Sequence, residues 1–237
     1  MSISFQVQKM DFSEDYDTRL RRALGHKVMP SRISKVISTP LYNEDGFIVI
    51  GSSQVEMAEV ILRDKVQKEV TSLIDEYINQ DLLKKYNLPV SNKILFYGPS
   101  GCGKTLLATA LAHSLAKPLL IINLAKIVDS GLGKTSSNIA QAFEEARSIR
   151  GILFFDEFDS LGKSRTEIND HGETRRITSS ILQMMDSLSN DVLMIAATNH
   201  IDFLDSAVIR RFSRKVEFLE PNKKEIGILL VHLVKKA

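Results

Sequence analysis

The chain has 237 residues, of which 43% are hydrophobic and 25% are charged, and its formal net charge is +2. This is the usage of an ordinary globular protein, with enough length for one large domain or two small ones. The weak net charge excludes the strongly basic balance that indicates nucleic-acid binding from composition alone, although it neither requires nor forbids such a partner.

Cysteine usage and apolar runs indicate the compartment. The single cysteine, Cys102, cannot form an internal disulfide, and the first 17 residues lack the apolar core of a signal peptide. The longest apolar runs, such as 118–122 and 152–155, are far shorter than the ~20 residues that a membrane span needs. We therefore expect a soluble protein of the reducing cytoplasm, with no membrane partner.

Residues 1–54 differ from the rest of the chain and are predicted to be an N-terminal appendage. They contain a charged stretch, two prolines and a turn-like segment at 43–46. Within them, acids precede bases over 11–28, which favours a helix. The bases of this region form a cluster. We interpret it as a solvated helical face rather than as a surface that binds a partner. Its members are Arg19, Arg21, Arg22, Lys27, Arg32 and Lys35.

Helical periodicity appears between residues 55 and 86. Apolar residues recur there at helical spacing, with an interruption near Asn79 and a resumption at Leu82. We expect one or two helices in this region, before the first strand of the core.

Beyond Asn92, short apolar runs alternate with amphipathic segments. The expected strands are 93–97, 118–124, 151–156, 192–198 and 215–220. The expected helices begin at Gly103 and Ser136 and span 173–188 and 223–235. Alternation of this kind predicts an α/β fold in which a five-stranded parallel sheet has helices on both faces.

A glycine-rich loop lies between the first of these strands and the following helix. Residues 98–105 read GPSGCGKT, which fits the pattern G-x-x-x-x-G-K-[ST] in its required strand–loop–helix context. Glycines allow backbone conformations in which successive N–H groups face phosphate at the helix N-terminus. In this pattern Lys104 reaches the β- and γ-phosphates, and the Thr105 hydroxyl binds Mg²⁺. The sequence therefore predicts a P-loop that binds ATP.

The predicted nucleotide-binding residues form one continuous segment. They are Gly98, Pro99, Ser100, Gly101, Cys102, Gly103, Lys104, Thr105 and Leu106. We interpret Cys102 as a small tolerated side chain rather than a redox-active group, because that loop position mainly offers backbone N–H.

A strand that ends in two acids supplies the second half of the predicted site. Residues 151–157 read GILFFDE, the pattern of a Walker B motif. Buried parallel strands carry functional side chains at their C-terminal ends, so Asp156 is expected to bind the metal, directly or through water. Glu157 is expected to orient or deprotonate the attacking water. Asp159 is expected to cap the following helix rather than to bind metal.

Asn199 directly follows the expected strand 192–198. We expect this strand to lie between the P-loop strand and the Walker B strand, which would bring the Asn199 amide near the γ-phosphate to position water. A turn-initiating asparagine is the alternative interpretation.

The order of these motifs resembles the AAA ATPase family. The segments that carry the resemblance read GPSGCGKT, GILFFDEFDSLG and VLMIAATNHIDFLDSAVIRRFSRKVEF, and it extends from about Val60 to Glu220. It implies a three-layer αβα P-loop NTPase core that assembles as a homo-oligomeric ring, often a hexamer, with nucleotide at the subunit interfaces. It also implies hydrolysis of ATP to ADP and phosphate, which drives remodelling of a protein partner. On this pattern the appendage precedes an ATPase core at 55–220, and 221–237 begin a truncated helical lid.

The resemblance also assigns roles to individual residues. Asn199 resembles the family's sensor 1. Arg210 and Arg211 resemble the arginine fingers that stabilise transition-state charge in the neighbouring subunit's site; a surface basic pair is the alternative. Val60 and Ile61 match the positions that line the adenine pocket, and core packing explains these two residues equally well.

Two features depart from the family's pattern. Gly131 occupies the position where protein-threading members have an aromatic residue in the pore loop, and glycine cannot grip a substrate chain. The family's lid, which carries a second sensor arginine, is largely absent, because a single predicted helix follows residue 220.

Three functions remain open at this point. The first is a ring-forming ATPase that remodels a protein partner. The second is a DNA-associated ATPase, such as a loader or a transposition helper, which the basic cluster would serve. The third is a nucleotide-gated assembly module with little hydrolysis.

Overall fold

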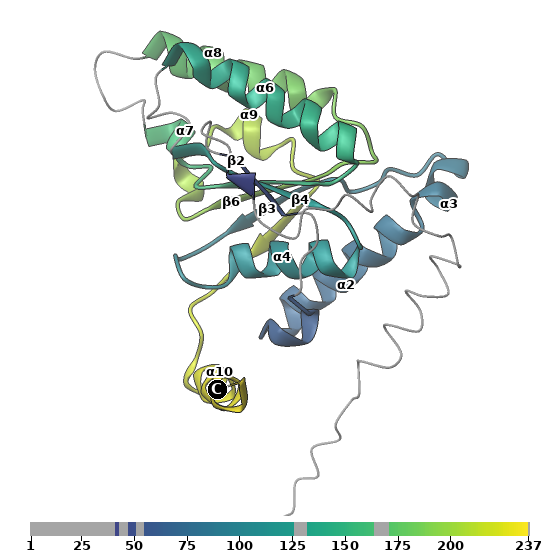
Figure 1. Ribbon diagram of the computed structural model, residues 1–237, viewed down its shortest axis with the longest axis vertical. Helices are drawn as coiled ribbons and strands as arrows, with labels where there is room; N and C mark the ends of the chain where they lie inside the picture. Colours follow the sequence, from purple (N-terminus) through teal and green to yellow (C-terminus); the bar gives the residue numbers. More distant parts are fainter. Residues whose placement is uncertain (1–40, 43–46, 51–54, 126–131, 164–170, 237) are drawn as a thin grey trace, which may run out of the picture. The chain divides into compact units, whose positions relative to one another are not determined.

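The computed structural model describes residues 41–42, 47–50, 55–125, 132–163 and 171–236 (Figure 1). The chain divides into two units, Met1–Lys35 and Val36–Ala237, and every described residue belongs to the second. The predicted helix at 11–28, the basic cluster and Gly131 lie outside the described residues.

Five parallel strands form the centre of the fold, as the sequence predicts. They are β3 (Lys93–Tyr97), β4 (Leu119–Asn123), β5 (Ile152–Asp156), β6 (Leu193–Thr198) and β7 (Arg214–Glu217). Their order in the sheet is β4-β5-β6-β3-β7. All six residues of β6 are buried, which explains why this strand reads as a continuous apolar run. Strand β6 lies between β5 and β3, where it was expected.

Two further strands extend the sheet at one edge. Strand β1 (Leu41–Tyr42) pairs with β2 (Phe47–Ile50), and β2 pairs antiparallel with β4. These strands were not predicted, because they are short and lie near a proline and turn residues. Part of the segment expected to be an appendage therefore joins the sheet.

Helices cover both faces of the sheet, in three layers (Figure 1). The elements of the first half are η2 (Met57–Glu59), α2 (Asp64–Ile78), α3 (Gln80–Lys85) and α4 (Lys104–Ser114). Those of the second half are α6 (Leu132–Ile149), α7 (Ser160–Lys163), α8 (His171–Asp186), η3 (Ile201–Phe203), α9 (Ser206–Ile209) and α10 (Lys223–Lys236). Helices α2 and α4 lie on one face, and α6 and α8 lie on the other. Helix α6 begins four residues before the predicted start at Ser136.

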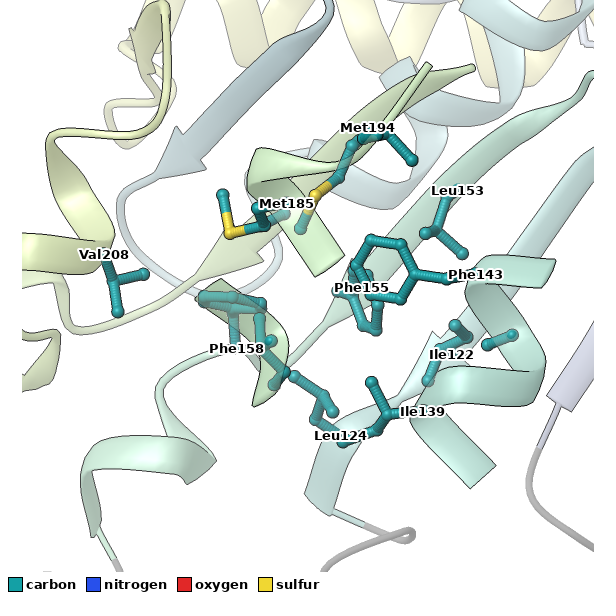
Figure 2. Packing of buried hydrophobic residues seen from close by; sticks show 14 of the residues in the cluster. Ile122, Leu124, Ile139, Phe143, Leu153, Phe155, Phe158, Met185, Met194 and Val208 are labelled. Carbon is teal, nitrogen blue, oxygen red and sulfur yellow. The ribbon is translucent and has the colours of Figure 1, made fainter. Parts of the chain in front are cut away.

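The main core lies between the sheet and the layer that contains α6 and α8 (Figure 2). Three ring contacts run through it: Phe143 to Phe155 at 5.6 Å, Phe155 to Phe158 at 5.8 Å, and Phe158 to Phe212 at 5.9 Å between centroids. The last two are edge-to-face, a favourable geometry for aromatic pairs. This row connects α6, β5 and the segment after α9, so the core fixes the residues that follow β5.

A separate cluster fixes the amino ends of the strands. Lys117 Nζ donates hydrogen bonds to the carbonyls of Arg150 (2.7 Å) and Asp191 (3.1 Å), and it lies over the Tyr77 ring. The Tyr77 hydroxyl also donates to the Asp191 carbonyl. Burial lowers the pKa of Lys117 and raises the pKa of Tyr77. This lysine is half-buried at the amino ends of the strands, away from their carboxyl ends.

A single helix, α10, follows β7 in the described part of the chain, as predicted. Its first turn is attached to the residue before α2, because Arg63 Nε donates to Glu225 at 3.0 Å. Among the described helices, none combines the length and apolar character needed to cross a bilayer.

Candidate functional site

The register of the parallel strands brings the predicted site residues together at the carboxyl ends of the strands. Tyr97 of β3 lies beside Thr198 of β6, and Asn123 of β4 lies beside Asp156 of β5. The P-loop, the Walker B acids and Asn199 therefore follow neighbouring strands at their carboxyl ends, the usual position of a ligand site in a parallel sheet.

The P-loop backbone uses three left-handed glycines. Gly98, Gly101 and Gly103 have φ angles of 137°, 77° and 91°. At Gly98 there is also no room for a side chain, because an added Cβ would lie 2.0 Å from the carbonyl oxygen of Phe218. Gly103 then precedes the first residue of α4. These conformations let the chain turn from β3 into α4, so that the N-terminus of α4 lies at the site.

Replacing Gly98 by alanine is expected to lower both stability and nucleotide affinity. The added methyl group requires a backbone shift at the start of the loop, and a positive φ alone costs a non-glycine residue on the order of 1–3 kcal/mol. Urea unfolding and titration with a fluorescent ATP analogue measure the two effects. Gly227→Ala is the control, because nothing lies within 4 Å of a Cβ at that position. Equal behaviour of the two variants would contradict the prediction.

Lys104 is buried, with only 7% of its surface exposed. Its Nζ donates to the carbonyls of Gly98 (2.7 Å) and Pro99 (2.8 Å) and to Asn199 Oδ1 (2.8 Å). Burial lowers the pKa of Lys104, and nearby acids oppose this effect. The lysine is thus held at the junction of the P-loop and the end of β6, which is where the predicted sensor residue lies.

Thr105 and Asp156 face each other across the site. Thr105 Oγ1 donates to Asp156 Oδ2 at 3.1 Å, and the other carboxylate oxygen accepts from the backbone N–H of Glu157 at 2.9 Å. Mg²⁺ is commonly held by a hydroxyl or one or two carboxylates together with phosphate oxygens and water, so these two oxygens fit the ion. Among the described residues, no group of three or more His, Cys, Asp or Glu side chains is placed to hold a metal alone.

Glu157 has an unusual backbone conformation. Its φ is +54°, in the left-handed region that non-glycine residues rarely adopt, and its side chain is exposed. The turn is fixed on both sides, because Phe158 N donates to the Ala197 carbonyl (2.8 Å) and Ser160 N donates to the Glu157 carbonyl (3.0 Å). Strain of this kind is found at functional sites, and here it occurs at the exposed acid that directly follows the end of β5.

Asp159 makes contacts that its sequence did not predict. Its side chain is fully buried, and Oδ1 accepts hydrogen bonds from Thr198 Oγ1 (3.1 Å) and the Asn199 backbone N–H (3.3 Å). Helix α7 does begin at the next residue, but these two bonds connect the Walker B segment to the end of β6. The only sequence signal was a third acid after the Walker B pair.

Replacing Thr198 by valine is expected to loosen this connection. Valine preserves the shape but removes the hydroxyl that donates to Asp159 and accepts from His200 N (3.0 Å). Leaving buried polar groups unsatisfied should lower the free energy of unfolding by about 1–3 kcal/mol. Urea denaturation measures this loss. A Thr198→Val protein as stable as the wild type would contradict the prediction.

The two predicted finger arginines differ in their surroundings. Arg211 makes a bidentate pair with Asp186, with Nε–Oδ1 at 2.8 Å and Nη2–Oδ2 at 2.9 Å. Hydrogen bonding within the pair lowers the pKa of Asp186 and raises the pKa of Arg211. Arg210 is exposed, and its side chain forms no hydrogen bond or ion pair within the described residues.

The remaining predicted binding residues differ in exposure. Pro99, Ser100, Gly101 and Leu106 are exposed, and Leu106 retains 42% of its surface, so the loop is open to a ligand. Val60 and Ile61 follow η2, which packs against α4; Val60 is buried and Ile61 is half-buried.

Comparison with known proteins agrees with this geometry. Residues 94–219 match the family described as "ATPase family associated with various cellular activities (AAA)". The chain belongs to the AAA ATPase family. The match covers more than half of the chain, from β3 through β7, and the predicted family and class of enzyme are thereby confirmed.

Individual AAA proteins are similar to this chain over most of its length. An uncharacterized AAA family ATPase of Sinorhizobium fredii is 38% identical over 172 residues, 73% of this chain and 52% of the relative. The 26S proteasome regulatory subunit 8 homolog of Naegleria fowleri is 30% identical over 217 residues, 87% and 51% of the two chains. An ATP-dependent zinc metalloprotease of Thermoanaerobacter is 34% identical over 185 residues, 76% and 36%. The chain thus spans between a third and about half of the length of these relatives.

Proposed function

We propose that this AAA chain binds ATP with Mg²⁺ and hydrolyses it to ADP and phosphate at a site completed by a second copy. The observation that carries the proposal is the meeting of Lys104, Thr105, Asp156 and Asn199 at one edge of the sheet, through hydrogen bonds of 2.8 Å and 3.1 Å. A lysine and a metal-binding pair at the N-terminus of one helix have the charge and spacing to bind a triphosphate.

Each residue has a role that its position favours. Lys104 would exchange its carbonyl contacts for phosphate oxygens, while Thr105 and Asp156 would hold Mg²⁺. The bound ion would neutralise charge on the β- and γ-phosphates. Glu157, exposed and adjacent to Asp156, would orient the attacking water and accept its proton. Asn199, already hydrogen-bonded to Lys104, would lie beside the γ-phosphate.

Assembly into a ring is part of the proposal. Arg210 and Arg211 follow the short helix α9, and within the described part of the chain neither side chain has a hydrogen bond or ion pair with the P-loop. A guanidinium that stabilises the transition state would therefore act on a neighbouring subunit's site. On this view ATP hydrolysis depends on oligomerisation, and the family is typically oligomeric.

A protein is the partner that the comparisons favour. One relative is named a proteasome regulatory subunit, and another is named an ATP-dependent metalloprotease. We propose that this chain likewise uses ATP to remodel a protein. A DNA-associated role rests on the basic cluster, which lies outside the described residues, and it stays a prediction.

Mixing two inactive variants tests the shared site. Lys104→Ala removes the P-loop lysine but keeps the arginines, whereas Arg210→Ala does the reverse. Each variant alone should release little phosphate, and a mixture should regain a substantial fraction of wild-type turnover, because an intact P-loop then meets an intact Arg210 from its neighbour. Solution mass with a slowly hydrolysed ATP analogue checks ring formation.

The mixing result also separates the alternatives. Monomers that bind ATP without releasing phosphate would support a nucleotide-gated assembly module instead. Activity that is lost in either variant and never regained on mixing would exclude a site shared between copies. Addition of EDTA to the wild-type protein should abolish phosphate release and leave the mass without nucleotide unchanged.

A further inference from the structure

The guanidinium of Arg211 is fully engaged inside its own chain. Two of its nitrogens donate to the two carboxylate oxygens of Asp186, at 2.8 Å and 2.9 Å, and Nη1 donates to the Ala207 carbonyl at 2.9 Å. Asp186 is the last residue of α8, and Ala207 belongs to α9. The side chain therefore connects the end of one helix to a neighbouring helical turn, with the planar bidentate geometry that suits arginine and carboxylate.

Helix α9 needs such external support. It comprises only four residues, Ser206–Ile209, too few for a helix to be stable without tertiary contacts. Its first turn is capped by Asp205, whose carboxylate accepts from Ala207 N at 2.9 Å. The carbonyl of the same residue, Ala207, accepts from Arg211, so this arginine supports the short helix that directly precedes Arg210.

The residues after Arg211 are also fixed. Phe212 is buried and packs edge-to-face against Phe158, which directly follows Glu157. Ser213 donates from both its backbone N–H (3.0 Å) and its hydroxyl (2.8 Å) to the Lys93 carbonyl at the start of β3. Contacts on both sides thus position Arg210, while its own side chain stays exposed.

We infer that Arg210 alone acts as the finger in the neighbouring subunit, and that Arg211, held by Asp186, is a positioning residue that fixes the direction of Arg210. This inference rests on the proposed function. A guanidinium that neutralises a carboxylate in its own chain must break that bidentate pair before it can neutralise phosphate in another. Arg210 has no such contact to break among the described residues. The two arginines are adjacent in sequence but have different roles.

Variants of Asp186 distinguish Arg211 as a positioning residue from Arg211 as a second finger. If Arg211 positions Arg210 through this carboxylate, Asp186→Ala and Arg211→Ala should each lower kcat by about tenfold, and the double variant should be no slower than either single one. Asp186→Glu, which keeps a carboxylate, should regain most of the turnover. The affinity for an ATP analogue should stay within about twofold of the wild type in all of them, because none contacts the P-loop.

The opposite assignment makes a different prediction. If Arg211 is itself a finger, Asp186→Ala frees it and should leave kcat unchanged or raise it, whereas Arg211→Ala should abolish turnover. That pattern would overturn the inference while leaving the proposed function intact. Loss of the shared site would show differently, as an Arg210→Ala variant with normal turnover. Thermal melting identifies variants that fail to fold, and in that event Asp186→Asn replaces Asp186→Ala.

Arg147 provides the matched control. It pairs with Glu144 at 2.6 Å and has the same side-chain exposure as Arg211, 32%. One of its nitrogens also donates to the carbonyl of Ser187, the residue after Asp186. Arg147→Ala should therefore disturb the end of α8 to a similar extent and leave kcat unchanged. A tenfold loss in this control would show that any change near α8 slows turnover, and would overturn the specific role given to Asp186.

Discussion

Replacing Glu157 by glutamine is expected to leave a protein that binds ATP and assembles but hardly hydrolyses. Glutamine has nearly the same shape and keeps the same backbone strain at φ +54°, so folding should not change. It cannot accept the proton of the attacking water, a contribution that typically amounts to 10²–10⁴-fold in rate. Phosphate release should fall by at least about 100-fold, while analogue affinity stays within about threefold. Single-turnover measurements separate the chemical step from product release.

Two further variants make the Glu157 result specific. Glu145→Gln removes another exposed carboxylate, on α6, and should leave turnover unchanged. Glu157→Gly removes the carboxylate and also the steric cost of a positive φ, so it should be as inactive as Glu157→Gln without any loss of stability. Normal hydrolysis by Glu157→Gln would refute the assignment of Glu157 as the residue that activates water.

Local sequence patterns were sufficient to predict which strands and loops form the site. The P-loop, the Walker B strand and the strand before Asn199 each combine a short apolar run with a distinctive following residue. Because the carboxyl ends of parallel strands share an edge, predicting the strands also predicted which residues would lie near one another. The five-stranded parallel sheet and the position of β6 between β5 and β3 were confirmed on this basis.

Contacts between distant residues were not predictable in the same way. The carbonyl of Phe218 approaches Gly98 across 120 positions of sequence, and Asp186 pairs with Arg211 across 25. Nothing around Asp186 marks it, since an exposed acid at the end of a helix is common. The same holds for the hydrogen bonds of Asp159, which depend on how β5 and β6 are aligned rather than on any local motif.

The two edge strands could not be predicted from their local sequence, for a different reason. Strands β1 and β2 contain two and four residues, and only pairing with β4 gives them a place in a sheet. A two-stranded hairpin is at best marginally stable alone, so its sequence need not carry a strong strand signal. Tertiary contact, and not local preference, determines that these residues are strands.

Replacing Lys104 by alanine is expected to abolish nucleotide binding at working concentrations of ATP. Among the described residues, Lys104 is the one cation that hydrogen-bonds to the P-loop carbonyls and Asn199. Hydrogen bonds to charged groups contribute about 1.5–3 kcal/mol each. Loss of one such contact to phosphate weakens affinity about 10- to 100-fold, and loss of the contacts to both phosphates should exceed this. Isothermal titration with ATP and Mg²⁺ measures the change.

Lys117 supplies the control for Lys104. Both lysines have a pKa lowered by burial, and both donate to two backbone carbonyls, but Lys117 lies at the amino ends of the strands. Lys117→Ala should lower the free energy of unfolding by about 1–3 kcal/mol and leave ATP affinity unchanged. ATP should then raise the melting temperature of Lys117→Ala as it does for the wild type, and have no effect on Lys104→Ala. Equal loss of ATP affinity in both variants would mean that a general loosening of the sheet, and not a lysine–phosphate contact, explains the Lys104 result.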